Sequence, residues 1–346
     1  MAARGKRRTP MRYDVLSRYR TELMGAAIGW VMLFHSFDLD LGHWAINWLR
    51  AAGFGGVDIF IVLSSMGLVM SLARREQDYS SFMARRASRV LPAYYIVMVP
   101  YTIFFILCYQ APWSALIWNC LLLYYWVRPV GAFNWYVAGS MTFYAVTPMC
   151  FRLMRRSRHR ELATAAGALA GLAACQVLMH DGYWNMLDVM YRVPVFFLGL
   201  LLGFYVLEDR KIGLWDALFW WGWAGLGAVY LWAMGRVQGP VFLPLCHLFF
   251  FTTVPLCLAL CWLFQHLPLD WLRCPLRLLG TYSLEIYLLN ISLFAEVSLL
   301  RRLVSFGPSN RLYYLLSYAA NIALAVLLHR LAEGLRQVWS GKKETA

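Results

Sequence analysis

The chain has 346 residues, of which 61% are hydrophobic and only 14% are charged. Soluble domains carry about 25% charged residues, so this chain lacks the polar surface that a water-soluble fold of its length needs. The composition argues against a disordered chain, a secreted disulfide scaffold and a soluble nucleic-acid-binding domain. It predicts an all-α fold, a polytopic bundle of transmembrane helices.

The net charge of +14 comes from basic residues gathered in short stretches between apolar segments, mainly at 4–20, 74–89, 152–160 and 342–343. Short basic loops are typical of the cytoplasmic side of a membrane protein, so we expect a multi-pass protein of the cell membrane with both termini in the cytoplasm and no nucleic-acid partner. The eight cysteines show no CxxC pair and no metal-ligand spacing, and we expect no metal site.

Ten apolar segments are long enough to cross a bilayer, with basic tails at 1–20 and 335–346 on either side of one membrane domain at 21–334. The predicted spans are 21–37, 53–73, 92–110, 134–151, 162–179, 193–207, 214–234, 241–265, 280–299 and 312–333. An eleventh, aromatic run at 113–127 is predicted to be re-entrant or interfacial. A full crossing there would turn the basic stretch 152–160 to the outside. The same topology places Arg301, Arg302 and Arg311 outside, against the charge rule.

Ionisable side chains inside apolar spans are functional candidates, because burying them at membrane depth is costly. His35 lies 15 residues after Arg20 on the first span, roughly 22 Å along a helix, and therefore toward the outer half. Asp58 enters the second span from the outside and reaches a comparable depth. A carboxylate beside an imidazole would fix its tautomer and leave the other nitrogen free to take a proton. The simpler alternative is that His35 ends one helix and Asp58 caps the next.

Three further sites carry charge. Arg86 and Arg89 lie three residues apart, so on a helix they share a face and form a fork for phosphate oxygens, although they could equally serve only to set the topology. Arg192 opens an apolar run whose Gly199 and Gly203 allow another helix to approach closely. Glu285 belongs to a polar stripe that points toward the bundle interior, where it could equally hold helices together.

These residues resemble, in order along the chain, the integral-membrane acyltransferase family three, whose members O-acylate glycans and other envelope molecules. The resemblance rests on Phe34–His35, on Gly56-Val57-Asp58-Ile59-Phe60 with Leu63-Ser64, on Arg86-x-x-Arg89-x-x-Pro92, on Asn134-Trp135-Tyr136 with Phe143-Tyr144 and Pro148, on Arg192-x-Pro194-x-Phe196-x-x-Gly199, and on Ser283-Leu-Glu285-Ile-Tyr287-Leu. It implies that His35 is essential for acyl transfer and that Arg86 and Arg89 form the cytoplasmic arginine pair of the family.

The chain departs from the family pattern at three positions. Met24 stands where a basic residue is usual, 11 positions before the histidine, although Arg20 lies one turn earlier on the same face. Ser65 replaces a common glycine, and Asn290 stands where histidine is frequent. The substitution at Met24 leaves altered donor handling or an inactive homologue as alternatives.

The resemblance and the residues together predict transfer of an acyl group, taken to be acetyl, from cytoplasmic acyl-CoA to a hydroxyl of an envelope glycan or lipid-linked sugar. The co-substrate would be acetyl-CoA, held by Arg86, Arg89 and Arg20, and no tightly bound cofactor is expected. His35 would act as general base or as a covalent acyl relay. Ser64 and Ser65 are candidate donors to the oxyanion. The alternative is a transporter of an acyl or sugar-lipid substrate without chemistry of its own.

Overall fold

The computed structural model describes residues 11–75, 77–127, 133–236, 241–294 and 311–339. Within these ranges the chain is helical and has no β-strand. One isolated antiparallel bridge joins Arg12 to Lys211. The predicted all-α fold class is therefore confirmed.

The α-helices are α1 (Val15–Arg18), α2 (Arg20–Phe34), α3 (Trp44–Ala51), α4 (Gly56–Arg74), α5 (Tyr79–Tyr109), α6 (Ser114–Cys120), α7 (Tyr124–Val127), α8 (Trp135–Arg156), α9 (Arg160–His180), α10 (Leu187–Met190), α11 (Val193–Leu207), α12 (Leu214–Met234), α13 (Leu248–His266), α14 (Asp270–Thr281), α15 (Ser283–Leu289) and α17 (Arg311–Trp339). Three 3-10 turns, Ala52–Gly55, Trp184–Met186 and Leu245–His247, and a π-helical turn at Asn290–Phe294 complete the described elements.

Six stretches of helix in the described residues are long and apolar enough to cross a membrane, and they match six of the ten predicted spans. The six are Trp44–Arg74, Tyr79–Tyr109, Arg160–His180, Leu187–Leu207, Leu245–His266 and Arg311–Val338. The other four predicted spans fall on α2, α8, α12 and α15, which are helical but shorter or less apolar. The count of ten is therefore not confirmed. The aromatic run at 113–127 forms only two short helices, of 7 and 4 residues. Arg301 and Arg302, which the predicted topology places outside, lie beyond the described residues.

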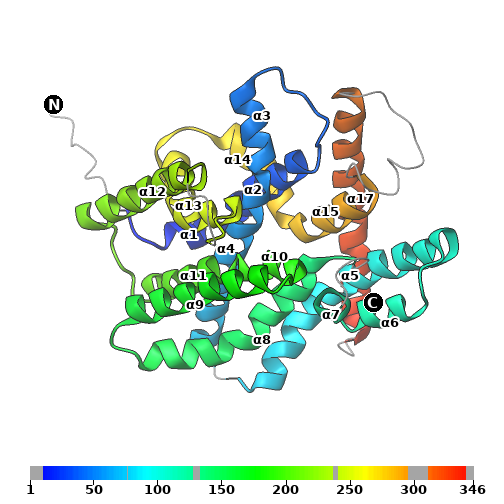
Figure 1. Ribbon diagram of the computed structural model, residues 1–346, viewed down its shortest axis with the longest axis horizontal. Coiled ribbons are helices and arrows are strands. Elements are labelled where there is room, and N and C mark those ends of the chain that lie inside the picture. The colour runs from blue at the N-terminus through cyan, green and yellow to red at the C-terminus, as the bar shows by residue number, and fades with distance from the viewer. Residues whose placement is uncertain (1–10, 76, 128–132, 237–240, 295–310, 340–346) are drawn as a thin grey trace, which may run out of the picture.

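Helix α4 runs through the middle of the bundle and contacts α2, α8, α11 and α13, as Figure 1 shows. The predicted close approach at Gly199 and Gly203 is between α11 and α4. A Cβ added at Gly199 would lie 2.5 Å from the carbonyl oxygen of Val62, and one added at Gly203 would lie 2.6 Å from the Cβ of Val69. Glycine is needed at both positions because the backbones of the two helices nearly touch.

A second close pair, α2 and α14, positions the N-terminal end of the first predicted span. Gly25 and Gly280 lie at the crossing, where an added Cβ would collide with the backbone of the opposite helix. Glu22 is buried there, and its Oε1 accepts a hydrogen bond of 2.8 Å from Nε of Arg277. This ion pair fixes the start of α2, which carries Arg20.

Both predicted tails contain residues that belong to or contact helices. Residues 11–20 pack against the bundle, where Tyr13 is 1% exposed and donates a 3.0 Å hydrogen bond to Asp216. The backbone N–H of Tyr13 also bonds to the carbonyl of Arg210. At the other end α17 continues to Trp339, beyond the predicted limit at residue 334.

Candidate active site

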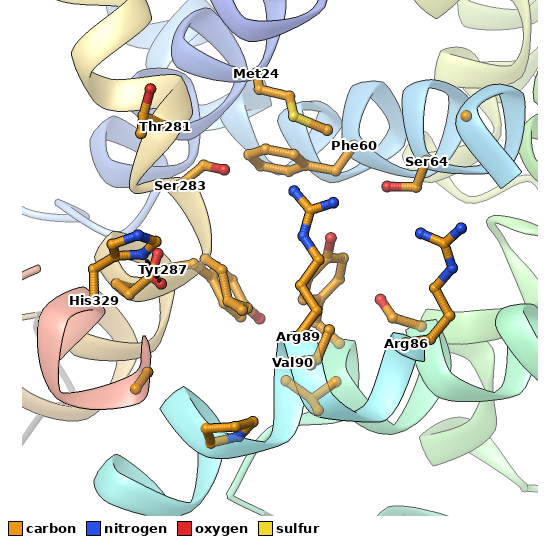
Figure 2. A pocket seen from close by; sticks show the side chains of 18 of the residues that line it. Met24, Phe60, Ser64, Arg86, Arg89, Val90, Thr281, Ser283, Tyr287 and His329 are labelled. Carbon is orange, nitrogen blue, oxygen red and sulfur yellow. Dashed lines mark hydrogen bonds and ion pairs between the residues drawn. The ribbon is translucent and has the colours of Figure 1, made fainter. Parts of the chain in front are cut away.

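Helices α2, α4, α5, α8, α14, α15 and α17 enclose a pocket of about 360 Å³. Three arginines that the sequence predicts to bind the donor, Arg20, Arg86 and Arg89, line this one pocket. Figure 2 shows Arg86 and Arg89 projecting from α5 on the same side, toward Ser64 and Phe60. Arginines from two chain segments, α2 and α5, thus form a single cationic site.

The start of α5 fixes the direction of its arginine pair. Asp78 caps the helix, since its Oδ2 accepts a 3.0 Å hydrogen bond from the backbone N–H of Ser81. Hydrogen bonds from the side chain and backbone of Ser81 lower the pKa of the Asp78 carboxyl. Two turns on, Nη2 of Arg86 donates a 2.9 Å hydrogen bond to Oγ of Ser71, and its guanidinium lies 5.3 Å from the centre of the Phe82 ring. Arg86 is therefore oriented before any ligand binds.

Arg20 reaches the pocket because Gly67 leaves room for it. A Cβ added at Gly67 would lie 3.0 Å from Nη1 of Arg20, so the guanidinium rests directly on the α4 backbone. Met24, which replaces the usual basic residue of the family, lines the same pocket one turn further along α2. In the part of the chain that the structure describes, no ion pair joins Arg20, Arg86 or Arg89 to a carboxylate. Their positive charge is available for an anionic ligand.

The two predicted oxyanion donors have different surroundings. Ser64 lines the pocket. Ser65 is 1% exposed, and its Oγ donates hydrogen bonds to the carbonyl oxygens of Ile61 and Val62, at 2.6 and 3.1 Å, where it packs against Gly199. The hydroxyl proton of Ser65 is therefore already used within its own helix, whereas Ser64 remains the candidate.

Glu285 is buried as predicted, and it pairs with a histidine that the sequence reasoning left without a role. Nδ1 of His329 lies 2.8 Å from Oε1 of Glu285, and both side chains line the arginine-containing pocket. The two residues are separated by 44 positions, so no local spacing reveals the pair. The signal present in the sequence was the ionisable ring of His329 near the end of a predicted span.

His35 ends α2 at the opposite end from Arg20 and is half-buried. Its Nδ1 lies 2.9 Å from the carbonyl oxygen of Val31, which only accepts a hydrogen bond, so Nδ1 carries the hydrogen and Nε2 is the nitrogen able to take a proton. Phe34 and Phe37 pack edge-on against the ring. The backbone, and not a carboxylate, therefore sets the tautomer of His35.

The predicted pairing of His35 with Asp58 is wrong in this structure. Asp58 is 1% exposed and forms an ion pair with Arg192, whose Nε lies 3.9 Å from Oδ2 of Asp58. The reason is the rotation of α4. The face of α4 that carries Gly56 packs on Ala27 of α2. Asp58 comes two residues after Gly56 and therefore points about 200° away from that face around the helix.

Arg192 is buried and has several partners besides Asp58. Its Nη1 donates a 2.8 Å hydrogen bond to the carbonyl of Asp188, and its guanidinium lies 4.7 Å from the centre of the Trp135 ring. With Asp58 it links α4 to the start of α11. Arg192 and Asp58 thus form a buried structural connection outside the arginine-containing pocket.

Comparison with known proteins identifies the family of this chain. A family model described as an acyltransferase domain matches residues 25–330. The chain is 28% identical, over 83% of its length and 76% of the relative's, to a Komagataeibacter xylinus protein named "Putative membrane-bound transacylase BcsY". No solved structure matches the chain significantly. Because the family match covers most of the chain, the protein belongs to acyltransferase family three and is a membrane acyltransferase, not a carrier without chemistry.

Proposed function

We propose that the protein transfers an acetyl group from cytoplasmic acetyl-CoA to a hydroxyl of an envelope glycan or lipid-linked sugar. The observation that carries the proposal is the convergence of Arg20, Arg86 and Arg89 on one pocket. Three guanidinium groups that form no ion pair with a carboxylate among the described residues favour a ligand with several negative charges. The phosphates of coenzyme A are such a ligand, and guanidinium forks match phosphate oxygens with strong, charge-assisted hydrogen bonds.

The proposed topology places this pocket at the inner face of the cell membrane and both termini in the cytoplasm. Arg20 begins α2 and His35 ends it, so the rise of the helix puts roughly 22 Å between them. The donor would bind from the cytoplasm, and the acceptor hydroxyl would arrive near His35 at the outer end. There Nε2 of His35 would take the hydroxyl proton, a role typically worth about 10²–10⁴ in rate.

Donor binding can be measured directly on detergent-solubilised full-length protein. Arg86→Ala combined with Arg89→Ala removes two charge-assisted contacts of about 1.5–3 kcal/mol each, so the Kd for acetyl-CoA should rise at least about 100-fold. Arg85→Ala is the matched control, because Arg85 is exposed on the same helix and does not line the pocket. Binding of acetyl-pantetheine, which lacks the nucleotide phosphates, should change little in either variant. An unchanged affinity for acetyl-CoA in the double variant would refute the assignment.

Transfer to the envelope is tested by mass spectrometry of envelope glycans from cells with and without the protein. His35→Ala should abolish the ester groups that depend on the protein, at normal protein levels. Ester groups at wild-type amounts in the His35→Ala cells would remove His35 from the reaction. Identical glycans with and without the protein would remove the proposed acceptor class.

A further inference from the structure

We propose that Nε2 of His329, supported by Glu285, is the first acceptor of the acyl group, so that the reaction passes through an acyl-His329 enzyme on the donor side. This inference rests on the proposed use of the pocket by an acyl-CoA. It decides between direct transfer and a covalent relay, and it assigns the relay to a histidine other than His35.

The first support is the geometry of the pair. Nδ1 of His329 lies 2.8 Å from Oε1 of Glu285, and a carboxylate can only accept, so the ring donates from Nδ1. The lone pair of the imidazole is then on Nε2, the atom that a nucleophile needs. The Glu285 side chain is 8% exposed and that of His329 is 36% exposed, so the acid is held in place while the ring remains accessible. Tyr282 packs edge-on against the ring at 5.2 Å and limits its rotation.

The second support is that this pair shares a cavity with the arginines. His329 and Glu285 line the same pocket as Arg86 and Arg89, and Figure 2 shows His329 on the far side of that pocket from Arg86. A donor whose phosphates bind at the arginines would extend its other end across the cavity. The reactive end of acyl-CoA is a thioester, and its carbonyl carbon is the electrophile that an imidazole would meet there.

The third support is the distance that the acyl group has to travel. His35 is not among the residues that line the arginine-containing pocket, and α2 separates it from Arg20 by roughly 22 Å. The two ends of α2 therefore carry different histidine chemistry, and acylation of His329 is the step that belongs to the donor end.

The Nε2 lone pair attacks the thioester carbonyl carbon, a C–N bond forms, and the C–S bond breaks with its electron pair leaving on sulfur as thiolate. The ring becomes an N-acylimidazolium, whose positive charge is stabilised by Glu285 through Nδ1–H, and the thiolate takes a proton from water. When the acyl group passes to an alcohol oxygen, the C–N bond electrons return to Nε2 and the hydroxyl proton goes to a base.

The test is a rapid-quench experiment on purified full-length protein with acetyl-CoA labelled in the acetyl group and no acceptor. We expect one equivalent of free thiol per protein in the first turnover, with the label on the protein. His329→Gln should lose both signals, since the amide can still donate to Glu285 but has no nucleophilic nitrogen. It should bind acetyl-CoA with unchanged Kd, which also shows that it is folded.

Two further variants make the result specific. His266→Gln is the matched control, because His266 is exposed at the end of α13 and its Nδ1 contacts only the backbone carbonyl of Trp262. It should keep the thiol burst and the label. His35→Ala should keep both as well, because His35 acts after acylation.

The proposal is overturned if His329→Gln retains the burst, if His35→Ala loses it, or if wild-type protein that binds acetyl-CoA releases no thiol. These outcomes leave the donor assignment intact, since that assignment depends on Kd and on Arg86 and Arg89. Wild-type protein that does not bind acetyl-CoA would instead refute the proposed function, and the acyl-His329 step with it.

Discussion

Replacement of Asp58 distinguishes a catalytic from a structural role for this carboxylate. The sequence predicts that Asp58 orients His35, in which case Asp58→Ala would reduce activity and leave stability unchanged. The structure instead pairs Asp58 with Arg192, with side-chain exposures of 2% and 3%. Asp58→Ala would therefore remove one of the two carboxylates that face the buried Arg192 guanidinium, and we expect the protein to lose stability.

The size of that loss follows from the surroundings of Arg192. Removing one partner of a buried ion pair typically costs about 3–5 kcal/mol. Arg192 would retain the carbonyl of Asp188 at 2.8 Å and the Asp188 carboxylate at 3.7 Å. Because those contacts remain, we expect a value near 3 kcal/mol, a large part of the total stability of a typical domain.

The assay is thermal unfolding in detergent, followed by tryptophan fluorescence, for Asp58→Ala, Arg192→Met and the double variant. Each single variant should unfold at a lower temperature than wild type. The double variant should be more stable than Asp58→Ala, because the buried guanidinium is removed together with its buried partner. An Asp58→Ala protein as stable as wild type but without transfer activity would refute the structural interpretation and restore the predicted dyad.

Three other expectations concern the pocket and its supporting helices. Arg20→Gln should weaken acetyl-CoA binding about 10- to 150-fold, because one charge-assisted contact is lost. Arg18→Gln is the control and should leave the Kd unchanged. Equal Kd values for wild type and Arg20→Gln would exclude Arg20 from the site. Gly199→Ala should destabilise the protein by about 1–3 kcal/mol in thermal unfolding, because its Cβ would meet the Val62 carbonyl at 2.5 Å, and an unchanged Tm would contradict that contact. The pKa of Asp78 is lower in the folded protein than in the unfolded chain. Its capping contribution to stability is therefore fully present above the pKa of the unfolded state, and it is lost as the pH falls through the pKa of the folded state. The Tm values of wild type and Asp78→Ala should converge in acid, and a constant difference would contradict the cap.

Helix periodicity predicts which side chains share a face, and the three arginines predicted to act together do line one pocket. Arg86 and Arg89 share a face because they are three residues apart, and Arg20 lies one turn from Met24, so local helix geometry is enough to identify them. The spans were harder to define. Helices α8 and α12 keep enough polar or aromatic residues that their apolarity is below that of the six clear spans, although both are helical over 22 and 21 residues.

Depth, however, does not determine which neighbouring helix a side chain faces, and this explains where the sequence reasoning failed. The sequence predicts comparable depths for His35 and Asp58, but the close packing of Gly56 on α2 fixes the rotation of α4 and turns Asp58 toward Arg192. The carboxylate–imidazole pair expected at His35 occurs instead between α15 and α17, joined by residues 44 positions apart. A contact between residues so far apart in the sequence depends on how α15 and α17 pack together, and no local sequence pattern indicates it. The chemistry that the sequence assigned to one histidine is thus divided: the backbone orients His35, and a carboxylate orients His329 beside the arginines.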